Sequence, residues 1–533
     1  MKKLLCLLPA LLCFMLVKAQ FQTVGEGQIF DEPEKGYCKI LQLKNGNTFF
    51  LRFTFRDGIY ITPYDKNHKA GTEVHVKPLF KKLAKSAGTT HIEGIFEIAG
   101  DVVVFVSKYE STGLTLYRLI MDGNNGNLKE DKVLAVLEKV SVWDAYGSAF
   151  GEGVSQNFYV KKDPYSENYA IAEMHSYAKD RNKRLEVFHY GSDHKIISDA
   201  FYTSPNGFYK YVNYLDMAVI GNERVCVLAY GYNTKSSGGK SSELLMASLN
   251  AGAKEITATK LDFTKDMTSV DGSVKYNPIT KKLVLVMAAQ VNGNGGYYSC
   301  YVSSVDLAEN KLEAFTEAIP TAATAKSAEI FGEKKAFYGL PQNVYINKDG
   351  SFAVVYEEIK VYSNSKGRIY TTLGNIAIGA YSNTGAELGS YLIPKSQQLE
   401  NVGLSPYYLA YREGKAQKME KGNQFKSFSY LNGINSSYIL FNDIAENEER
   451  IKKGKRPVTI QNPRYCDAYL YPVKGREIMP TRQYAFGQPD KGDHNMALFA
   501  ISDYDQANNI YVTLKRAKDG HHRGVQLAWL QPS

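Results

Sequence analysis

The chain has 533 residues, 22% of them charged, and a formal net charge of +9 at pH 7. A chain of this length can bury a large core without disulfide staples. Its basic residues form no stripe, and the densest groups, 179–184 and 452–456, look like loop or linker charge, so the composition argues against a nucleic-acid binder.

The N-terminus has the three parts of a secretory signal. Lys2 and Lys3 precede the apolar run 4–17, and Val17-Lys18-Ala19 forms a small-residue cleavage site before Gln20. The run is shorter than the roughly 20 residues of a membrane-spanning helix. We therefore predict a cleavable signal at residues 1–19 and a mature chain of 20–533, with a formal charge of +6 once three lysines leave.

No second apolar run of spanning length follows Gln20, so we expect no membrane span. A lipid anchor is also disfavoured. Cys13 follows Leu12 rather than a small residue, and Cys6 lies too early in the signal.

The first β pattern along the mature chain is a hairpin. The run 48–55 leads through Arg56-Asp57-Gly58 into 59–62, and an Asp-Gly turn between β-branched and aromatic runs is a strong hairpin signal. The pattern returns at 95–98 with 102–107, at 219–220 with 225–230, and at 344–346 with 352–356.

A third strand follows many of these hairpins and ends near an Asp or Asn and a Gly turn, as at 376–381 before Asn383-Thr384-Gly385. A hairpin plus a third strand, repeated, describes a propeller blade. Segments start near Cys38, Gly94, Phe158, Val212, Ser273, Asn343, Phe425 and Asn495. Their spacing exceeds the roughly 40–50 residues of a minimal blade, which indicates long inter-strand loops.

We therefore predict an all-β fold, a β-propeller of seven or eight blades over residues 20–533, closed by strands from both termini. Radial repetition also protects the many strand edges. The alternative is two β domains that divide near the charged stretch 446–455. Helical signal is sparse: 79–84 fits about two turns, and 446–453 predicts a solvated helix.

Four cysteines remain after the signal, at Cys38, Cys226, Cys300 and Cys466. They are far apart in the sequence and form no C-x-x-C motif, which argues against structural zinc and thioredoxin-like chemistry. We expect buried thiols and a fold that survives reduction.

No catalytic, metal or cofactor motif stands out. The sequence has no G-x-S-x-G, H-E-x-x-H or phosphate-binding loop. The nine histidines do not form a ligand set, and His175 lies beside a different strand from His189. Asp503-Tyr504-Asp505 places oxygen ligands on alternate residues but lacks the rest of a calcium loop, so a strand-end turn is favoured. We predict no catalytic residues, no metal and no cofactor.

Tyrosine is the abundant aromatic residue, with 39 in the chain against two tryptophans. Most of these tyrosines fit strands, where β-propensity explains them. Tyr232, Tyr297 and Tyr298 instead lie in or beside glycine-rich loops, where exposed rings grip a glycan or a peptide. They are the predicted binding residues.

The run from Gln424-Phe425-Lys426-Ser427-Phe428 to Tyr438-Ile439-Leu440-Phe441-Asn442-Asp443, with the Asp/Asn-Gly hairpins and the Ala19-Gln20 signal end, resembles uncharacterised secreted propeller-like proteins of the Bacteroidota. The resemblance implies fold and compartment, and no characterised family. The ending 527–533 does not resemble the C-terminal sorting domain of many such proteins, which favours the periplasm over the cell surface.

These observations favour an exported binding or scaffold propeller that presents loops to a protein or glycan partner. The alternative is a carbohydrate-active enzyme, of glycoside hydrolase or lyase type, with carboxylates at the central face. A non-enzymatic role is favoured, and a nucleic-acid partner is not expected. A deep axial pocket with several carboxylates would favour the enzyme, and a flat face rimmed by tyrosines would favour binding.

Overall fold

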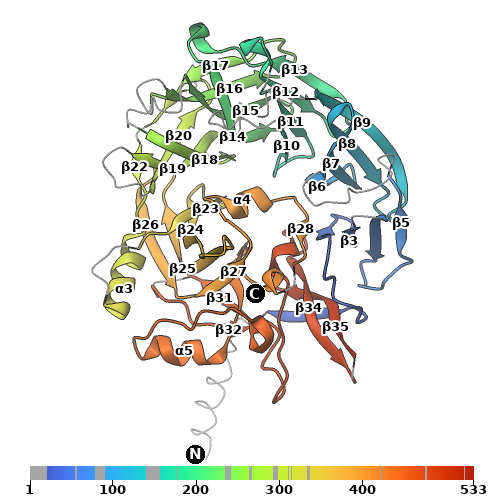
Figure 1. Ribbon diagram of the computed structural model, residues 1–533, viewed down its shortest axis with the longest axis vertical. Coiled ribbons are helices and arrows are strands. Elements are labelled where there is room, and N and C mark those ends of the chain that lie inside the picture. Colours follow the sequence, from blue (N-terminus) through green and yellow to red (C-terminus); the bar gives the residue numbers. More distant parts are fainter. Residues whose placement is uncertain are drawn as a thin grey trace, which may run out of the picture.

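The computed structural model describes residues 21–54, 57–78, 90–139, 157–176, 178–233, 242–262, 267–291, 298–309, 311–313, 315–332, 337–420, 422–474, 477–520 and 522–533. These residues form eight antiparallel sheets arranged in a ring (Figure 1). The fold is an eight-bladed β-propeller, so the predicted fold class is confirmed at the higher of the two blade numbers. The predicted signal 1–19 and the predicted helical turns at 79–84 lie outside the described residues.

Each blade begins with its innermost strand and continues outward. The strands of blades 1 to 4 are β2 (Tyr37–Gln42), β3 (Thr48–Thr54), β4 (Gly58–Tyr64) and β5 (Val74–Val76); β6 (Thr90–Ile98), β7 (Asp101–Tyr109), β8 (Gly113–Met121) and β9 (Leu128–Glu138); β10 (Asn157–Lys162), β11 (Tyr169–Met174), β12 (Leu185–Tyr190) and β13 (Ile196–Phe201); β14 (Tyr211–Ile220), β15 (Arg224–Tyr232), β16 (Ser242–Asn250) and β17 (Thr257–Lys260).

Blades 5 to 7 follow the same order, and blade 8 adds the first strand of the chain as its outermost one. Their strands are β18 (Met267–Asn277), β19 (Lys282–Val291), β20 (Tyr298–Asp306), β21 (Lys311–Leu312) and β22 (Thr316–Glu317); β23 (Leu340–Ile346), β24 (Phe352–Ser363), β25 (Ile369–Tyr381), β26 (Glu387–Ile393) and β27 (Gln397–Glu400); β29 (Ser429–Asn432), β30 (Ser437–Asp443), β31 (Asp467–Val473) and β32 (Gln483–Tyr484); β33 (Asp503–Asp505), β34 (Ile510–Asp519), β35 (His522–Gln531) and β1 (Gln22–Glu26).

The hydrophobic core is divided among the blade interfaces. The buried described residues form eight clusters, one between each pair of neighbouring blades. Strand β7 shows why: Val102, Val104 and Val106 pack toward blade 1, whereas Val103 and Phe105 pack toward blade 3. Successive side chains of a strand point to opposite faces, so a wholly apolar run is what a blade buried on both sides requires.

Blade 8 joins the two ends of the chain. Strand β1 pairs with β35, with Thr23 opposite Leu530. Beside this seam, the buried Trp529 donates its indole N–H to Thr48 Oγ1 at 3.0 Å and stacks on His68 with ring centroids 4.5 Å apart. Contacts from blade 8 to blade 1 therefore complete the ring.

The three α-helices of the described residues are insertions between strands. They are α3 (Thr321–Phe331), α4 (Tyr408–Arg412) and α5 (Ala445–Lys452). Helix α5 confirms the predicted solvated helix, but it lies inside blade 7, between β30 and β31. The charged stretch is therefore an insertion within a blade, and the alternative of a boundary between two β domains is wrong.

The connection between blades 6 and 7 crosses the ring. This crossing segment, residues 401–418, contains α4 and the short strand β28 (Gln417–Lys418), which pairs with β2 of blade 1. On its way, Tyr407 N–H donates to Pro341 O at 2.8 Å, and Gly414 O accepts from Ile95 N–H at 2.6 Å. Helix α4 accordingly lies near the centre of the ring in Figure 1.

The four cysteines are buried and free, as expected from their spacing. Burial raises the pKa of Cys226 to about 11 and that of Cys38 and Cys300 to about 12, so these thiols are poor nucleophiles. Among the described residues, no helix has the length and apolar character needed to cross a membrane.

Candidate functional site

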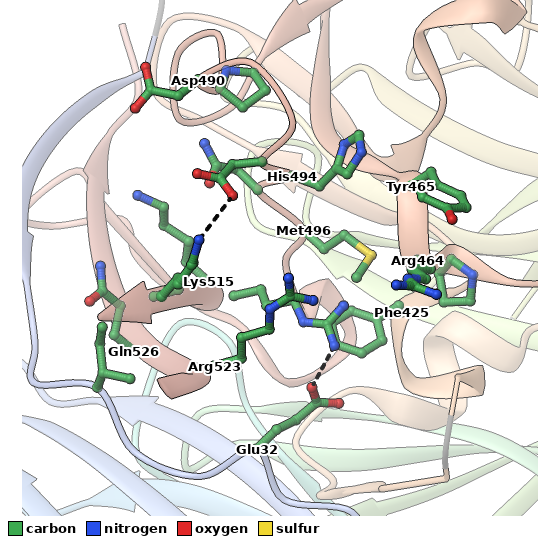
Figure 2. Close-up of a pocket in the computed structure, with 18 of the residues that line it drawn as sticks. Glu32, Phe425, Arg464, Tyr465, Asp490, His494, Met496, Lys515, Arg523 and Gln526 are labelled. Carbon is green, nitrogen blue, oxygen red and sulfur yellow. Dashed lines mark ion pairs between the residues drawn. The ribbon is translucent and has the colours of Figure 1, made fainter. Parts of the chain in front are cut away.

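One cavity is a groove of about 810 Å³ beside blades 7 and 8 (Figure 2). It lies where β34 ends and β35 begins, and the loop that leads into blade 8 forms one wall. Its charged lining residues are balanced, five basic and five acidic: Arg464, Lys515, Arg516, Lys518, Arg523, Glu26, Glu32, Glu34, Asp490 and Asp493.

Ion pairs hold one side of the groove. Lys515 Nζ lies 2.7 Å from Glu26 Oε1, and Gln526 donates to the other oxygen of the same carboxylate, also at 2.7 Å. Arg516 lies 3.8 Å from Glu32. Burial raises the pKa of the Glu32 carboxyl. These contacts join β34 and β35 to the last residue of β1 and to the chain that follows it, so they serve the closure of the ring.

Two arginines of the groove have no such partner. Among the described residues, no acidic side chain forms an ion pair with Arg464 or Arg523. In Figure 2 the two side chains point toward one another from opposite sides of the groove, with Met496 and Phe425 nearby. The middle of the groove is therefore cationic, although its full lining is balanced, and the buried side chains of Met496 and Phe425 lie beside it.

Arg464 owes its position to a short helical turn. The turn η6 (Pro463–Tyr465) starts with proline at its first position, where the missing N–H costs nothing. Asn462 caps it by accepting from Arg464 N–H at 3.0 Å. The turn leaves Arg464 and Tyr465 exposed, with 61% of Tyr465 accessible, and the guanidinium lies 5.5 Å from the ring centroid.

A histidine and an aspartate lie at the same wall. His494 Nδ1 is 3.3 Å from Asp467 Oδ2, and the other oxygen of this buried carboxylate accepts from Asn495 N–H at 2.8 Å. His494 lines the groove with a third of its side chain exposed, and its ring meets Tyr465 edge-on at 5.8 Å. A carboxylate that fixes one ring nitrogen of a histidine prepares the other for proton transfer.

The second cavity lies on the axis of the ring. This axial pocket, about 520 Å³, is lined by the innermost strands of all eight blades, and Glu413 and Gly414 of the crossing segment contribute to it. Its residues come from the last part of those strands, as Tyr276 and Ile346 illustrate, whereas the groove lies at the opposite ends. The two cavities therefore belong to opposite faces of the propeller.

Charges in and around the axial pocket are paired with one another. Lys161 Nζ lies 2.5 Å from Asp216, whose carboxylate also accepts from Ser273 Oγ and Val274 N–H at 2.9 Å each. Lys275 Nζ lies 2.5 Å from Glu413. These contacts tie blades 3, 4 and 5 to the crossing segment, so the central charges act as cross-links between blades.

Asp503 also contributes to this pocket. It accepts from Gln42 N–H at 2.7 Å and lies 3.9 Å from Lys39, which links blades 8 and 1. Asp505 accepts from the N–H groups of Ala507 and Asn508, which confirms the predicted strand-end turn. The axial pocket thus has the carboxylates expected of an enzyme, but lysines form ion pairs with them and backbone N–H groups donate hydrogen bonds to them.

The predicted binding tyrosines lie elsewhere. Tyr232 is buried, with 6% exposed, and stacks on Tyr211 at 5.2 Å and on Tyr230 at 5.9 Å. Tyr298 is half-buried against the core between blades 5 and 6, and Tyr297 lies outside the described residues. Neither Tyr232 nor Tyr298 lines the groove or the axial pocket.

The sequence offered only a weak signal for the groove. Its residues come from segments more than 400 positions apart, from Glu32 to Arg523, and only ring closure brings them together. The triplet Asn462-Pro463-Arg464 was the one local hint, because it reads as a capped turn that presents the arginine.

No family model matches the chain, and no curated protein matches it. Among solved structures, it is similar to a prolyl endopeptidase (10% identity, TM-score 0.39), covering 91% of this chain but only 55% of that one. It is also similar to an ulvan lyase described as a polysaccharide lyase (8%, 0.38; 87% and 98% covered) and to a protein of unknown function from Dyadobacter fermentans (8%, 0.29; 97% and 100%). Likenesses this distant say nothing of activity.

Proposed function

We propose that the protein binds acidic oligosaccharides in the groove beside blades 7 and 8. The observation that carries the proposal is the pair of exposed arginines, Arg464 and Arg523, which face one another and have no acidic partner in the described part of the chain. A guanidinium presents a planar fork of donors that matches a carboxylate or sulfate. Two forks on opposite walls match charges spaced along a polymer.

The apolar parts of the groove support a sugar rather than a free anion. Tyr465 is 61% exposed beside Arg464, whereas Phe425 and Met496 also border the groove but are buried. Aromatic faces with a hydroxyl handle bind the apolar face of a pyranose ring while polar groups hold its substituents. An acidic sugar therefore satisfies both halves of the lining.

The test is titration calorimetry with short oligogalacturonate, a heparin-derived oligosaccharide and a neutral malto-oligosaccharide. We expect one or both acidic ligands to bind and the neutral one to bind at least tenfold more weakly. The double variant Arg464→Ala/Arg523→Ala should lose at least tenfold in affinity, since each charge-assisted hydrogen bond contributes about 1.5–3 kcal/mol.

The matched control removes two exposed arginines from other blades, Arg181→Ala with Arg368→Ala. It should bind as the wild type does. Equal affinity for poly-glutamate would show that the groove reads charge alone and favour an acidic protein partner. No acidic-glycan binding by the wild type, or unchanged binding by the groove variant, would refute the proposal.

A second function is favoured by one specific observation, the His494–Asp467 pair in the same groove. In a lyase reaction, the free nitrogen of His494 would take the proton next to the carboxyl group of a uronate. The electrons of that C–H bond would form a C=C bond as the glycosidic C–O bond breaks, and the leaving oxygen would take a proton from the resulting imidazolium or from water. Arg464 or Arg523 would neutralise the carboxylate and so acidify the C–H bond.

The lyase candidate is tested by the ultraviolet absorbance of the unsaturated product. His494→Ala should abolish product formation while oligosaccharide affinity changes little, because the arginines provide the binding. If wild-type protein binds acidic oligosaccharides but releases no unsaturated product from any of them, the groove is a binding site and His494 belongs to its wall.

We also propose that the protein is exported and resides in the periplasm, on the strength of the signal pattern at residues 1–19. Mass analysis of protein from fractionated cells should find Gln20 at the N-terminus in the periplasmic fraction. Retention of residues 1–19 on that material would refute this proposal and leave the proposed groove function untouched.

A further inference from the structure

Two glutamates on neighbouring strands of blade 3 lie directly opposite one another. Strands β11 and β12 pair in antiparallel register with Glu173 opposite Glu186. Like charges at such a position destabilise a sheet, and the residue Glu173 is only 6% exposed. A positive group between the two carboxylates would relieve this repulsion.

Lysine does not fill that role. Other buried carboxylates of the propeller have one, as Glu357 has Lys395 and Asp216 has Lys161. Among the described residues, the only ion-pair partner of either Glu173 or Glu186 is His175. The chain places this imidazole, rather than a long basic side chain, between the two acids.

A backbone hydrogen bond fixes the position of His175 between the two glutamates. His175 follows the last residue of β11, and its N–H donates to Arg184 O at 2.8 Å. Its Nε2 atom lies 3.5 Å from Glu173 Oε2 and 3.5 Å from Glu186 Oε2. That buried nitrogen has no hydrogen-bond partner within the described residues, although it faces two acceptors.

The ligand atoms have the spacing of a metal site. One nitrogen and two carboxylate oxygens all lie within 4.8 Å of one another. Around a tetrahedral zinc ion with bonds of about 2.0–2.1 Å, neighbouring ligand atoms are about 3.3 Å apart, close to the two distances of His175. Hard cations such as Ca²⁺ take six or more oxygen ligands, so one nitrogen and two oxygens favour Zn²⁺.

We propose that Glu173, His175 and Glu186 form a zinc-binding site on blade 3, with a fourth coordination position open to water. Side-chain exposures of 26% for His175 and 16% for Glu186 give an ion a path from solvent. The site lies where β11 ends and β12 begins, the same strand ends that face the groove in blade 8, but three blades away around the closed ring. It is therefore independent of the proposed glycan site.

The competing occupant is a proton. Burial by itself lowers the pKa of His175, but the nearby carboxylates of Glu173 and Glu186 outweigh it and raise the value to about 9. A protonated imidazole between the carboxylates would be an ordinary ion triad. Zinc binding must displace that proton, so a zinc site and a protonated ion triad differ in the metal content that can be measured.

The experiment dialyses the mature chain against Zn²⁺, measures bound metal by mass spectrometry, and repeats the titration with Co²⁺. We expect one zinc per chain, a melting midpoint raised by about 2 °C at a hundredfold excess over Kd, and visible Co²⁺ bands of tetrahedral type. His175→Ala and the isosteric Glu186→Gln should each lose at least tenfold in zinc affinity.

The matched control is His91→Ala, which removes an exposed histidine from blade 2. It should keep the full zinc content and the Co²⁺ spectrum. Variants that melt near the wild-type temperature without metal but bind no zinc support the site. Wild-type zinc content no higher than that of His175→Ala, or loss of zinc in the His91 variant alone, would overturn it and leave the ion triad.

Discussion

The axial pocket and the groove beside blades 7 and 8 use charge in different ways. In the pocket, Lys161 and Lys275 each meet a carboxylate from another segment at 2.5 Å, and the contacts hold blades together. In the groove, Arg464 and Arg523 extend toward one another and meet no carboxylate of the described residues. A cavity rich in acidic groups is therefore not by itself an active site, because pairing determines whether those groups are free to act.

The largest effect should come from breaking a central pair. Asp216→Ala leaves Lys161 without its partner and removes the acceptor of Ser273 and Val274 N–H, so we expect a loss of about 3–5 kcal/mol in unfolding free energy. Urea unfolding followed by circular dichroism measures it. Arg523→Ala, from the groove, should change stability by less than about 0.5 kcal/mol. Equal losses would abolish the distinction between the two cavities.

A smaller effect should come from changing the shape of a groove charge without removing it. Arg523→Lys keeps the positive charge but loses the planar fork, so affinity for oligogalacturonate should fall about tenfold. Calorimetric titration of this variant beside Arg368→Lys tests it. Affinity unchanged in Arg523→Lys would mean that the groove senses net charge rather than two-pronged contacts.

The stability of the protein should depend on pH through Asp271, which contacts Tyr411 of the crossing segment. Burial raises the pKa of Asp271 from its ordinary 3.8 to about 6, while the O–H of Tyr411 donates to its carboxylate. The native state thus holds this proton more tightly than the unfolded state. The resulting stability is present below about pH 4 and is lost as pH rises through about 6.

Asp271→Asn mimics the protonated side chain, so it should raise stability above pH 7 by about 1 kcal/mol and flatten the profile between pH 4 and 6. Denaturant unfolding at a series of pH values gives both quantities. Parallel profiles for the wild type and the variant would show that another group titrates in this window.

The smallest effect should come from the tyrosine loops. Tyr298 packs against the core between blades 5 and 6, away from both cavities, so Tyr298→Ala should alter oligogalacturonate affinity by less than about twofold. The titration is made at a temperature where the variant is folded. If Tyr298→Ala abolishes binding while Arg523→Ala does not, the glycine-rich loops form the site and the groove does not.

Much of the ring could be predicted because each blade is a local unit. Cys38, Phe158 and Val212, marked as segment starts from sequence alone, lie at the first strands β2, β10 and β14. Turn residues and apolar runs close in sequence determine such strands. The last two starts, Phe425 and Asn495, fall several residues before β29 and β33, because long loops with short helical turns precede these strands.

The sites could not be predicted in the same way because they depend on distant segments. Asp216 in blade 4 contacts Lys161 in the neighbouring blade 3. Local sequence patterns do not predict how two sheets pack against one another, so they could not predict this contact. The position of a histidine in the sequence does not show its neighbours on other strands, and His175 acquires two carboxylates only through the register of β11 with β12. Pairing Glu173 with Glu186 across a predicted hairpin would have revealed that set.

The pairing of β1 with β35 also bears on the kinetics of folding and unfolding. Gln22 lies opposite Gln531, so the contact that completes blade 8 joins the two ends of the described chain and needs every other blade in place first. Such a contact contributes late to folding and therefore acts chiefly on the rate of unfolding. We therefore expect the β1–β35 pairing to set how long the closed ring persists before it unfolds.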